Sequence, residues 1–231
     1  MIRAVLFDLD GTLSFMNQDE FMRNYVGLLT PRFTHLMSPD RFAKQLMRST
    51  EVMRSQPQPG KTNMQTFFDD FCRATGLKFS VLFPILEDFY QLDFPALSCI
   101  VKPNPAGKAT VELAKKQGYL VAVAANPVMP YAAIAERIRW TGLMPAQFDL
   151  VPAMEDAHFC KPNVGFFSEI ASCLKLDPRE CLMVGNDVQE DMIAKEIGMK
   201  TFFCGEPPVE PVSDYAGSLT DLGHLLLQGN L

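Results

Sequence analysis

The chain has 231 residues, of which 48% are hydrophobic and 21% charged, and its formal net charge is −6. This composition is that of an ordinary folded protein and excludes an intrinsically disordered chain. It offers no basic patch for DNA or RNA, and no apolar run approaches the ~20 residues that cross a bilayer, so we expect neither a nucleic-acid partner nor a membrane span.

The N-terminus and the cysteines predict a cytoplasmic protein. The apolar run at residues 2–7 is too short for a secretory signal before acidic residues interrupt it. The six cysteines include no CxxC pair and have no histidine at metal-ligand spacing. We therefore expect buried free thiols in a reducing compartment and no structural zinc site.

The first predicted element is a buried strand with acids at its end. Ile2–Phe7 is a short run that is apolar apart from Arg3, typical of a central strand. Asp8 and Asp10 follow it directly, and Gly11 allows a sharp backbone turn toward a ligand. Two acids in one loop favour a cation, and a carboxylate beside Mg²⁺ stays ionised and can attack phosphorus. The second acid can then donate and accept protons.

A predominantly helical segment comes next in the chain. Apolar residues recur there at three- and four-residue spacing, interrupted by proline and glycine. The predicted helices are Asp19–Met37, Pro39–Arg54, Thr62–Thr75 and Ser80–Tyr90. Its many Phe and Met side chains are expected mainly in its own core, although some can line a substrate pocket. We therefore predict a small helical domain at 15–99, inserted into a core of 1–14 and 100–231.

From Pro105 onward, helices and strands alternate. Helices are predicted at 106–117, 131–141, 164–174, 189–197 and around 222–227, strands at 119–125, 149–152, 181–184 and 200–203, and a loop at 207–211. Such alternation predicts an α/β fold with a Rossmann-like parallel sheet and helices on both faces. In such sheets ligands bind beyond the carboxyl ends of the strands. The residues that follow each strand are therefore the candidates for a functional site.

The motif Asp8-Leu9-Asp10-Gly11-Thr12, at the end of the first strand, resembles the D-x-D-G-T motif of phosphatases in the haloacid dehalogenase superfamily. The resemblance implies that Asp8 is the nucleophile and Asp10 the general acid and base, and that both bind Mg²⁺. It also implies that Gly11 and Thr12 bind the substrate. The helical domain becomes, by the same resemblance, a mobile cap that closes over the site and selects the substrate.

The second and third family motifs follow later strands. Family members usually have Ser or Thr where this chain has Ala125. We expect the amide of Asn126, or backbone N–H groups of the loop, to bind the phosphoryl oxygens instead; alternatively, Asn126 only opens the loop before Pro127. Lys161 in the Lys161-Pro162 pair is expected to neutralise the nucleophile and the phosphoryl group.

The fourth motif begins at Gly185. We predict Asp187 as a Mg²⁺ ligand, because a hard divalent cation prefers a carboxylate to an amide. If Gly185 sets the alignment, Asn186 takes that position instead. Asp187 can also cap the helix that follows. Asp191 is expected to orient Lys161 or a metal-bound water.

The four motifs occur in family order over nearly the whole chain. Together they predict a Mg²⁺-dependent phosphatase that hydrolyses a phosphate monoester of a small metabolite. The predicted intermediate is an aspartyl-phosphate. A phosphomutase acting on a sugar phosphate shares that intermediate and is the nearest alternative. A non-catalytic binding protein on a degenerated scaffold is a second alternative, suggested by Ala125. Carbon–halogen hydrolysis is disfavoured, because that branch typically lacks the acid found here at Asp10.

Overall fold

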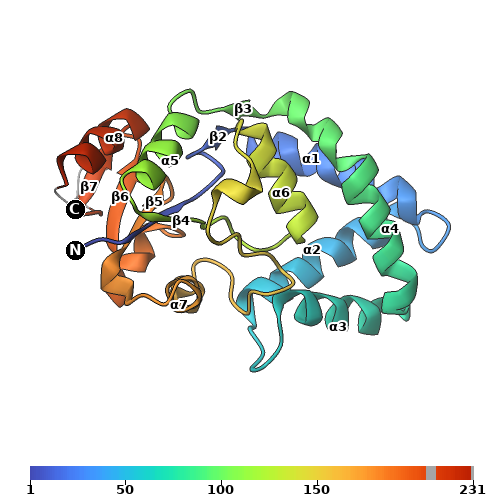
Figure 1. The fold of residues 1–231 in the computed structure, drawn as a ribbon. Helices are drawn as coiled ribbons and strands as arrows, with labels where there is room; N and C mark the ends of the chain where they lie inside the picture. Colours follow the sequence, from blue (N-terminus) through green and yellow to red (C-terminus); the bar gives the residue numbers. More distant parts are fainter. Residues whose placement is uncertain (207–211, 230–231) are drawn as a thin grey trace.

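A computed structural model describes residues 1–206 and 212–229, so the loop predicted at 207–211 lies outside the described residues. Within these ranges, five parallel strands form the central sheet in the order β4-β1-β5-β6-β7 (Figure 1). The strands are β1 Ala4–Phe7, β4 Leu120–Val123, β5 Cys181–Gly185, β6 Lys200–Cys204 and β7 Tyr215–Gly217. The sheet confirms the predicted Rossmann-like core.

The register of the central strands brings their carboxyl ends to one edge. Phe7 pairs with Val123 on one side and with Val184 on the other. The ladder continues one residue further, because Asp8 N donates to Val184 O (2.9 Å) and Ala124 N donates to Phe7 O (2.7 Å). The loops that follow β1, β4 and β5 therefore meet at the same edge of the sheet.

Helices cover both faces of the sheet, as predicted. They are α5 Gly107–Lys116, α6 Tyr131–Trp140, α7 Val164–Cys173 and α8 Leu219–Gln228. Alternate residues of β1 point to opposite faces: Val5 and Phe7 join the core beneath α5, α6 and α8, whereas Ala4 and Leu6 pack with α7. Both faces of β1 are fully buried, which explains why its sequence is apolar without alternation.

Between β1 and β4 the chain forms a mostly helical segment, residues 16–101, which we call the helical insertion. It contains α1 Gln18–Leu29, α2 Pro39–Ser55, α3 Asn63–Thr75 and α4 Phe79–Leu92, with 3₁₀ helices at Thr30–Phe33 and Phe94–Ile100. Figure 1 shows α2, α3 and α4 grouped to the right of the sheet. The chain leaves and re-enters the core through two short antiparallel strands, β2 Ser14–Phe15 and β3 Lys102–Pro103. Buried phenylalanines fill the interior of the helical insertion, as expected.

Several predicted boundaries are wrong. The first insertion helix ends at Leu29 rather than Met37, because Pro31 cannot donate a backbone hydrogen bond and begins a 3₁₀ turn. The strand predicted at 149–152 is a single bridge from Leu150 to Ala122. The helix predicted at 189–197 is a 3₁₀ helix at Met192–Ile197. The short strand β7 was not predicted, since three residues carry no readable periodicity.

Two expectations about compartment and membranes can be compared with the structure. All six cysteines are free, but only Cys160 and Cys181 are buried. Cys72 and Cys204 are partly exposed and Cys99 and Cys173 are exposed, so the expectation of buried thiols is confirmed for two of the six. None of the described helices combines the length and apolar character needed to cross a lipid bilayer.

Candidate active site

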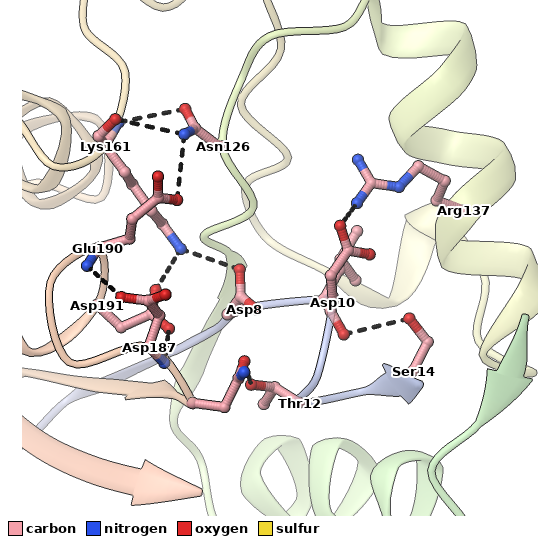
Figure 2. A network of polar contacts seen from close by, with 12 residues as sticks. Asp8, Asp10, Thr12, Ser14, Asn126, Arg137, Lys161, Asp187, Glu190 and Asp191 are labelled. Atoms are coloured by element: carbon pink, nitrogen blue, oxygen red, sulfur yellow. Dashed lines mark hydrogen bonds and ion pairs between the residues drawn. The ribbon is translucent and has the colours of Figure 1, made fainter. Parts of the chain in front are cut away.

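A buried lysine connects two acids at the edge of the sheet. Asp8, directly after β1, accepts a hydrogen bond from Lys161 Nζ at 2.9 Å, and Asp191 accepts from the same nitrogen at 2.5 Å (Figure 2). Lys161 is only 1% exposed. Lysine is almost never buried this completely without paired carboxylates. The predicted contacts of Lys161 with Asp8 and Asp191 are therefore both present.

The electrostatics of this cluster favour a charged lysine. Burial lowers the pKa of Lys161, but the nearby charges of Asp8 and Asp191 outweigh it and raise the pKa above its usual value. Burial raises the pKa of Asp8 to about 7, Lys161 opposes this effect, and the charges of Asp191 and Asp10 reinforce it. One ammonium group is thus shared between two carboxylates.

Asp191 reaches Lys161 across the end of β5. It is 1% exposed, and its second oxygen accepts a hydrogen bond from Asp187 N at 3.0 Å. A Cβ atom added at Gly185 would overlap the Asp191 carboxylate. Glycine at the strand end is therefore required for this close approach.

The side chain of Asp187 caps its own loop. Its Oδ1 accepts hydrogen bonds from Gln189 N (2.7 Å) and Glu190 N (2.8 Å). The capping role considered for Asp187 is thus observed. Asp187 also lines the cavity described below.

Asn186 joins the loop after β5 to the loop after β1. Its Oδ1 accepts a hydrogen bond from the buried hydroxyl of Thr12 at 3.1 Å. Gly11 has a φ of +86°, and a Cβ atom there would overlap the Asn186 side chain. Thr12 and Gly11 therefore hold the two loops together in this structure, with the Thr12 hydroxyl engaged by Asn186.

Asn126 joins the loop after β4 to the Lys161 loop. Its Nδ2 donates to Lys161 O (3.3 Å), its Oδ1 accepts from Lys161 N (3.2 Å), and Nδ2 also lies 3.4 Å from a carboxylate oxygen of Glu190. Glu190 in turn pairs with Arg54 of α2 at 2.6 Å. The Asn126 amide thus fixes the backbone of Lys161, and Ala125 beside it is buried.

Asp10 faces a partner that the sequence analysis missed. Its carboxylate is paired with Arg137 of α6, and Figure 2 shows it turned toward that guanidinium rather than toward Asp8. Arg137 is 7% exposed, and its Nε has no hydrogen-bond partner among the described residues. The available signal was its position between Ile134 and Ile138 on the apolar side of a predicted helix, where a charge needs a buried partner.

The predicted metal ligands do not converge as side chains. Within the part of the chain that the structure describes, no three His, Cys, Asp or Glu side chains are grouped closely enough to hold a metal ion. The Asp10 carboxylate is held by Arg137, and that of Asp187 by its own loop. The carboxylates of Asp8, Asp10 and Asp187 therefore do not meet at one point in this arrangement of the side chains, and their role as Mg²⁺ ligands stays a prediction.

The charge and donor type of the site nevertheless suit a hard divalent cation. Acidic side chains outnumber basic ones in the network. The acids are Asp8, Asp10, Asp187, Glu190 and Asp191, and the bases are Arg54, Arg137 and Lys161. Carboxylate oxygens with excess negative charge are the donors that Mg²⁺ prefers.

The network borders a large cavity between the core and the helical insertion. Its volume is about 590 Å³, and its core side is lined by Asp10, Asn126, Arg137, Asp187 and Glu190. Pockets for small ligands commonly measure ~300–1,000 Å³. The acids and Lys161 therefore lie at or next to a space large enough for a small-molecule substrate.

Comparisons with known proteins agree on one family. The sequence model of the haloacid dehalogenase-like hydrolases matches residues 2–198. A pyrophosphatase, PpaX, of Bacillus cereus is 24% identical over 203 residues, which cover 87% of this chain and 82% of PpaX. The structure is similar to a phosphatase from Thermococcus onnurineus (TM-score 0.61, 23% identity, 97% and 98% of the two chains). It is also similar to an L-2-haloacid dehalogenase from Xanthobacter autotrophicus (TM-score 0.59, 14% identity, 100% of both chains).

Proposed function

The chain belongs to the haloacid dehalogenase-like hydrolases, and from that premise we propose that it is a Mg²⁺-dependent phosphatase that hydrolyses a phosphate monoester through an aspartyl-phosphate on Asp8. One observation carries the proposal: Asp8, at a buried strand end, is held at 2.9 Å by the buried Lys161. A carboxylate positioned beside a fixed positive charge and next to a cavity suits attack on an anionic phosphoryl group.

The proposed reaction has two steps. An oxygen of Asp8 attacks phosphorus, the P–O bond to the leaving alcohol breaks, and protonated Asp10 gives its proton to the departing oxygen. A water molecule then attacks the phosphorus of the aspartyl-phosphate, Asp10 takes a proton from it, and the bond between phosphorus and Asp8 breaks. Lys161 offsets negative charge at Asp8 throughout. For this role Asp10 turns from Arg137 toward the reacting oxygen.

Mg²⁺ fits the excess of carboxylates in the network. Asp8 and Asp187 would hold it, joined by Asp10 on release from Arg137. The bound ion would reduce repulsion between the nucleophile and the phosphoryl oxygens.

We further propose that residues 15–99 act as a cap on a core of 1–14 and 100–231. Two features support this division. The paired strands β2 and β3 form a narrow connection to the core, and the Arg54–Glu190 ion pair joins α2 to the active-site loop across the cavity. Opening would break this pair and admit the substrate.

Asp8→Asn tests the proposal. Asparagine keeps the size of the side chain and can still accept a hydrogen bond from Lys161, but it is a poor nucleophile. We expect Mg²⁺-dependent hydrolysis of 4-nitrophenyl phosphate to disappear, with an unchanged circular dichroism spectrum, and EDTA to abolish wild-type activity. Asp69→Asn, at an exposed ion pair, is the control that should keep full activity. Wild-type turnover by Asp8→Asn would refute the assignment.

A further inference from the structure

The cavity has two unlike walls. The core wall carries the charged groups described above. The wall formed by the helical insertion is largely apolar. Its members include Met22, Leu46, Phe67, Phe68, Phe83 and Leu86. The core wall also has apolar members such as Val128, Met129 and Met154, so a ligand that spans the cavity meets the charged groups at one end and mostly hydrocarbon elsewhere.

Arg54 of the insertion wall pairs with Glu190 of the core wall. The other polar groups of the insertion wall are at its rim or bonded within the protein. Gln18, Glu87 and Gln91 are exposed. The buried hydroxyl groups of Tyr25 and Tyr90 bond to each other at 2.7 Å. Hydroxyl groups of a sugar placed against this wall would lose water and gain few partners, which is unfavourable.

Two further polar groups that line the cavity, Thr50 and Glu155, form hydrogen bonds with the backbone. The hydroxyl of Thr50 donates to Leu46 O at 2.9 Å, and both carboxylate oxygens of Glu155 accept from Tyr131 N at 2.9 and 3.0 Å. The Thr50 hydroxyl therefore has no free proton to donate, and Glu155 has one backbone donor already bound to its carboxylate.

Two arginines at the charged end have unused donors. The buried Nε atoms of Arg54 and Arg137 have no hydrogen-bond partner among the described residues, and both side chains line the cavity. Guanidinium groups suit phosphate oxygens. They sit on the same cavity as Asp10 and Asn126, so an anionic group bound here would lie next to the network around Asp8.

We propose that the substrate is a phosphate monoester of an apolar alcohol, whose aryl or alkyl body packs against the insertion wall, rather than a phosphorylated sugar or polyol. This inference rests on the proposed phosphatase function and specifies its substrate class. A cavity of about 590 Å³ has room for such a body in addition to the phosphoryl group. Each buried methylene contributes about a fourfold gain in binding.

The test compares two esters of primary alcohols, 2-phenylethyl phosphate and glucose 6-phosphate, so that the leaving groups are chemically similar. We expect kcat/KM to be about 100-fold higher for 2-phenylethyl phosphate. Equal values, or a preference for glucose 6-phosphate, would overturn the inference while leaving the phosphatase function intact.

A matched pair of variants on α4 locates the preference. Leu86 lines the cavity, whereas Leu92, on the same helix, is 67% exposed and does not. We expect Leu86→Asn to lower kcat/KM for 2-phenylethyl phosphate about tenfold and to leave glucose 6-phosphate unaffected. Leu92→Asn should change neither. Equal effects of the two variants would contradict the assigned wall.

Failure of the function and failure of the inference give different results. If neither ester is hydrolysed, and 4-nitrophenyl phosphate is not hydrolysed either, the phosphatase proposal is wrong. Whenever neither ester is hydrolysed, calorimetry with non-hydrolysable phosphonates decides the binding question. Tighter binding of 3-phenylpropylphosphonate than of the phosphonate analogue of glucose 6-phosphate would support an apolar anion site. Equal or weaker binding would overturn it.

Discussion

The core edge and the helical insertion build opposite walls of one cavity by different physical means. At the core edge, charged side chains such as Lys161 and Asp191 are nearly fully buried and are held by short ion pairs and strand-end hydrogen bonds. In the insertion, stability comes from packed aromatic rings, and its cavity wall is largely apolar. In the proposed function, the chemistry is assigned to the few fixed charges of the core edge, and selection of the substrate to the apolar surface of the insertion.

The largest effect is expected from removing the shared cation. Lys161→Met leaves Asp8 and Asp191 facing each other in a buried site with no positive charge between them. We expect a loss of ~3–5 kcal/mol in the free energy of unfolding and a fall in kcat of at least about 100-fold. Urea unfolding and steady-state kinetics measure the two quantities.

The matching control is Lys115→Met. Its ion pair with Asp149 is 3.4 Å long and about one-third exposed on both sides, so the cost should stay below ~1 kcal/mol. Similar losses for the two lysines would mean that the core edge does not depend on its buried charge.

The next largest effect is expected at the turn that joins two active-site loops. Gly11→Ala combines a φ of +86° with overlap against Asn186 and should cost ~2–3 kcal/mol. Gly60→Ala has a similar φ of +74° but open space around it, so it should cost only ~1 kcal/mol. Equal costs, measured by thermal unfolding, would show that the Asn186 contact is unimportant.

A smaller effect is expected where the core contacts Asp10. Arg137→Met removes a guanidinium that lines the cavity and suits phosphate oxygens, so it should lower kcat/KM about tenfold. Arg139→Met, on the exposed side of the same helix, serves as the control. An unchanged kcat/KM in Arg137→Met would show that Arg137 does not contribute to catalysis.

The smallest effect is expected in the interior of the insertion. Phe42→Leu breaks the stacked pair with Phe33, whose ring centroids are 4.3 Å apart, and should cost ~1 kcal/mol. Turnover of 4-nitrophenyl phosphate per folded molecule should not change, since Phe42 is not among the residues that line the cavity. A tenfold drop in kcat/KM, as expected for Arg137→Met, would show that the interior of the insertion and the core edge are not independent.

The part of the site at the strand ends could be predicted from the sequence, because the register and connectivity of the parallel strands determine it. A buried run ending in Asp8, and another ending at Gly185, must share an edge when both strands are parallel and paired. The contact of Lys161 with Asp8 and Asp191 followed from motif order. The helices of the insertion were readable from their periodicity, apart from their ends.

Side-chain direction within loops was not readable. Asp187 could bind a metal or cap its loop, and only the backbone geometry shows that it caps Gln189 and Glu190. Asp10 was expected to face Asp8, but the competing partner Arg137 lies 127 residues away in sequence. Such long-range competition between charges leaves no local pattern.

In the proposed function, Asp8 carries the phosphoryl group during turnover. The direct measurement is to quench the enzyme in acid during hydrolysis of 4-nitrophenyl phosphate with Mg²⁺, reduce it with borohydride and sequence its peptides by mass spectrometry. An aspartyl-phosphate is reduced to homoserine, so the account predicts homoserine at position 8 and none in Asp8→Asn. Homoserine at another aspartate, or none at any position during measurable turnover, would contradict it.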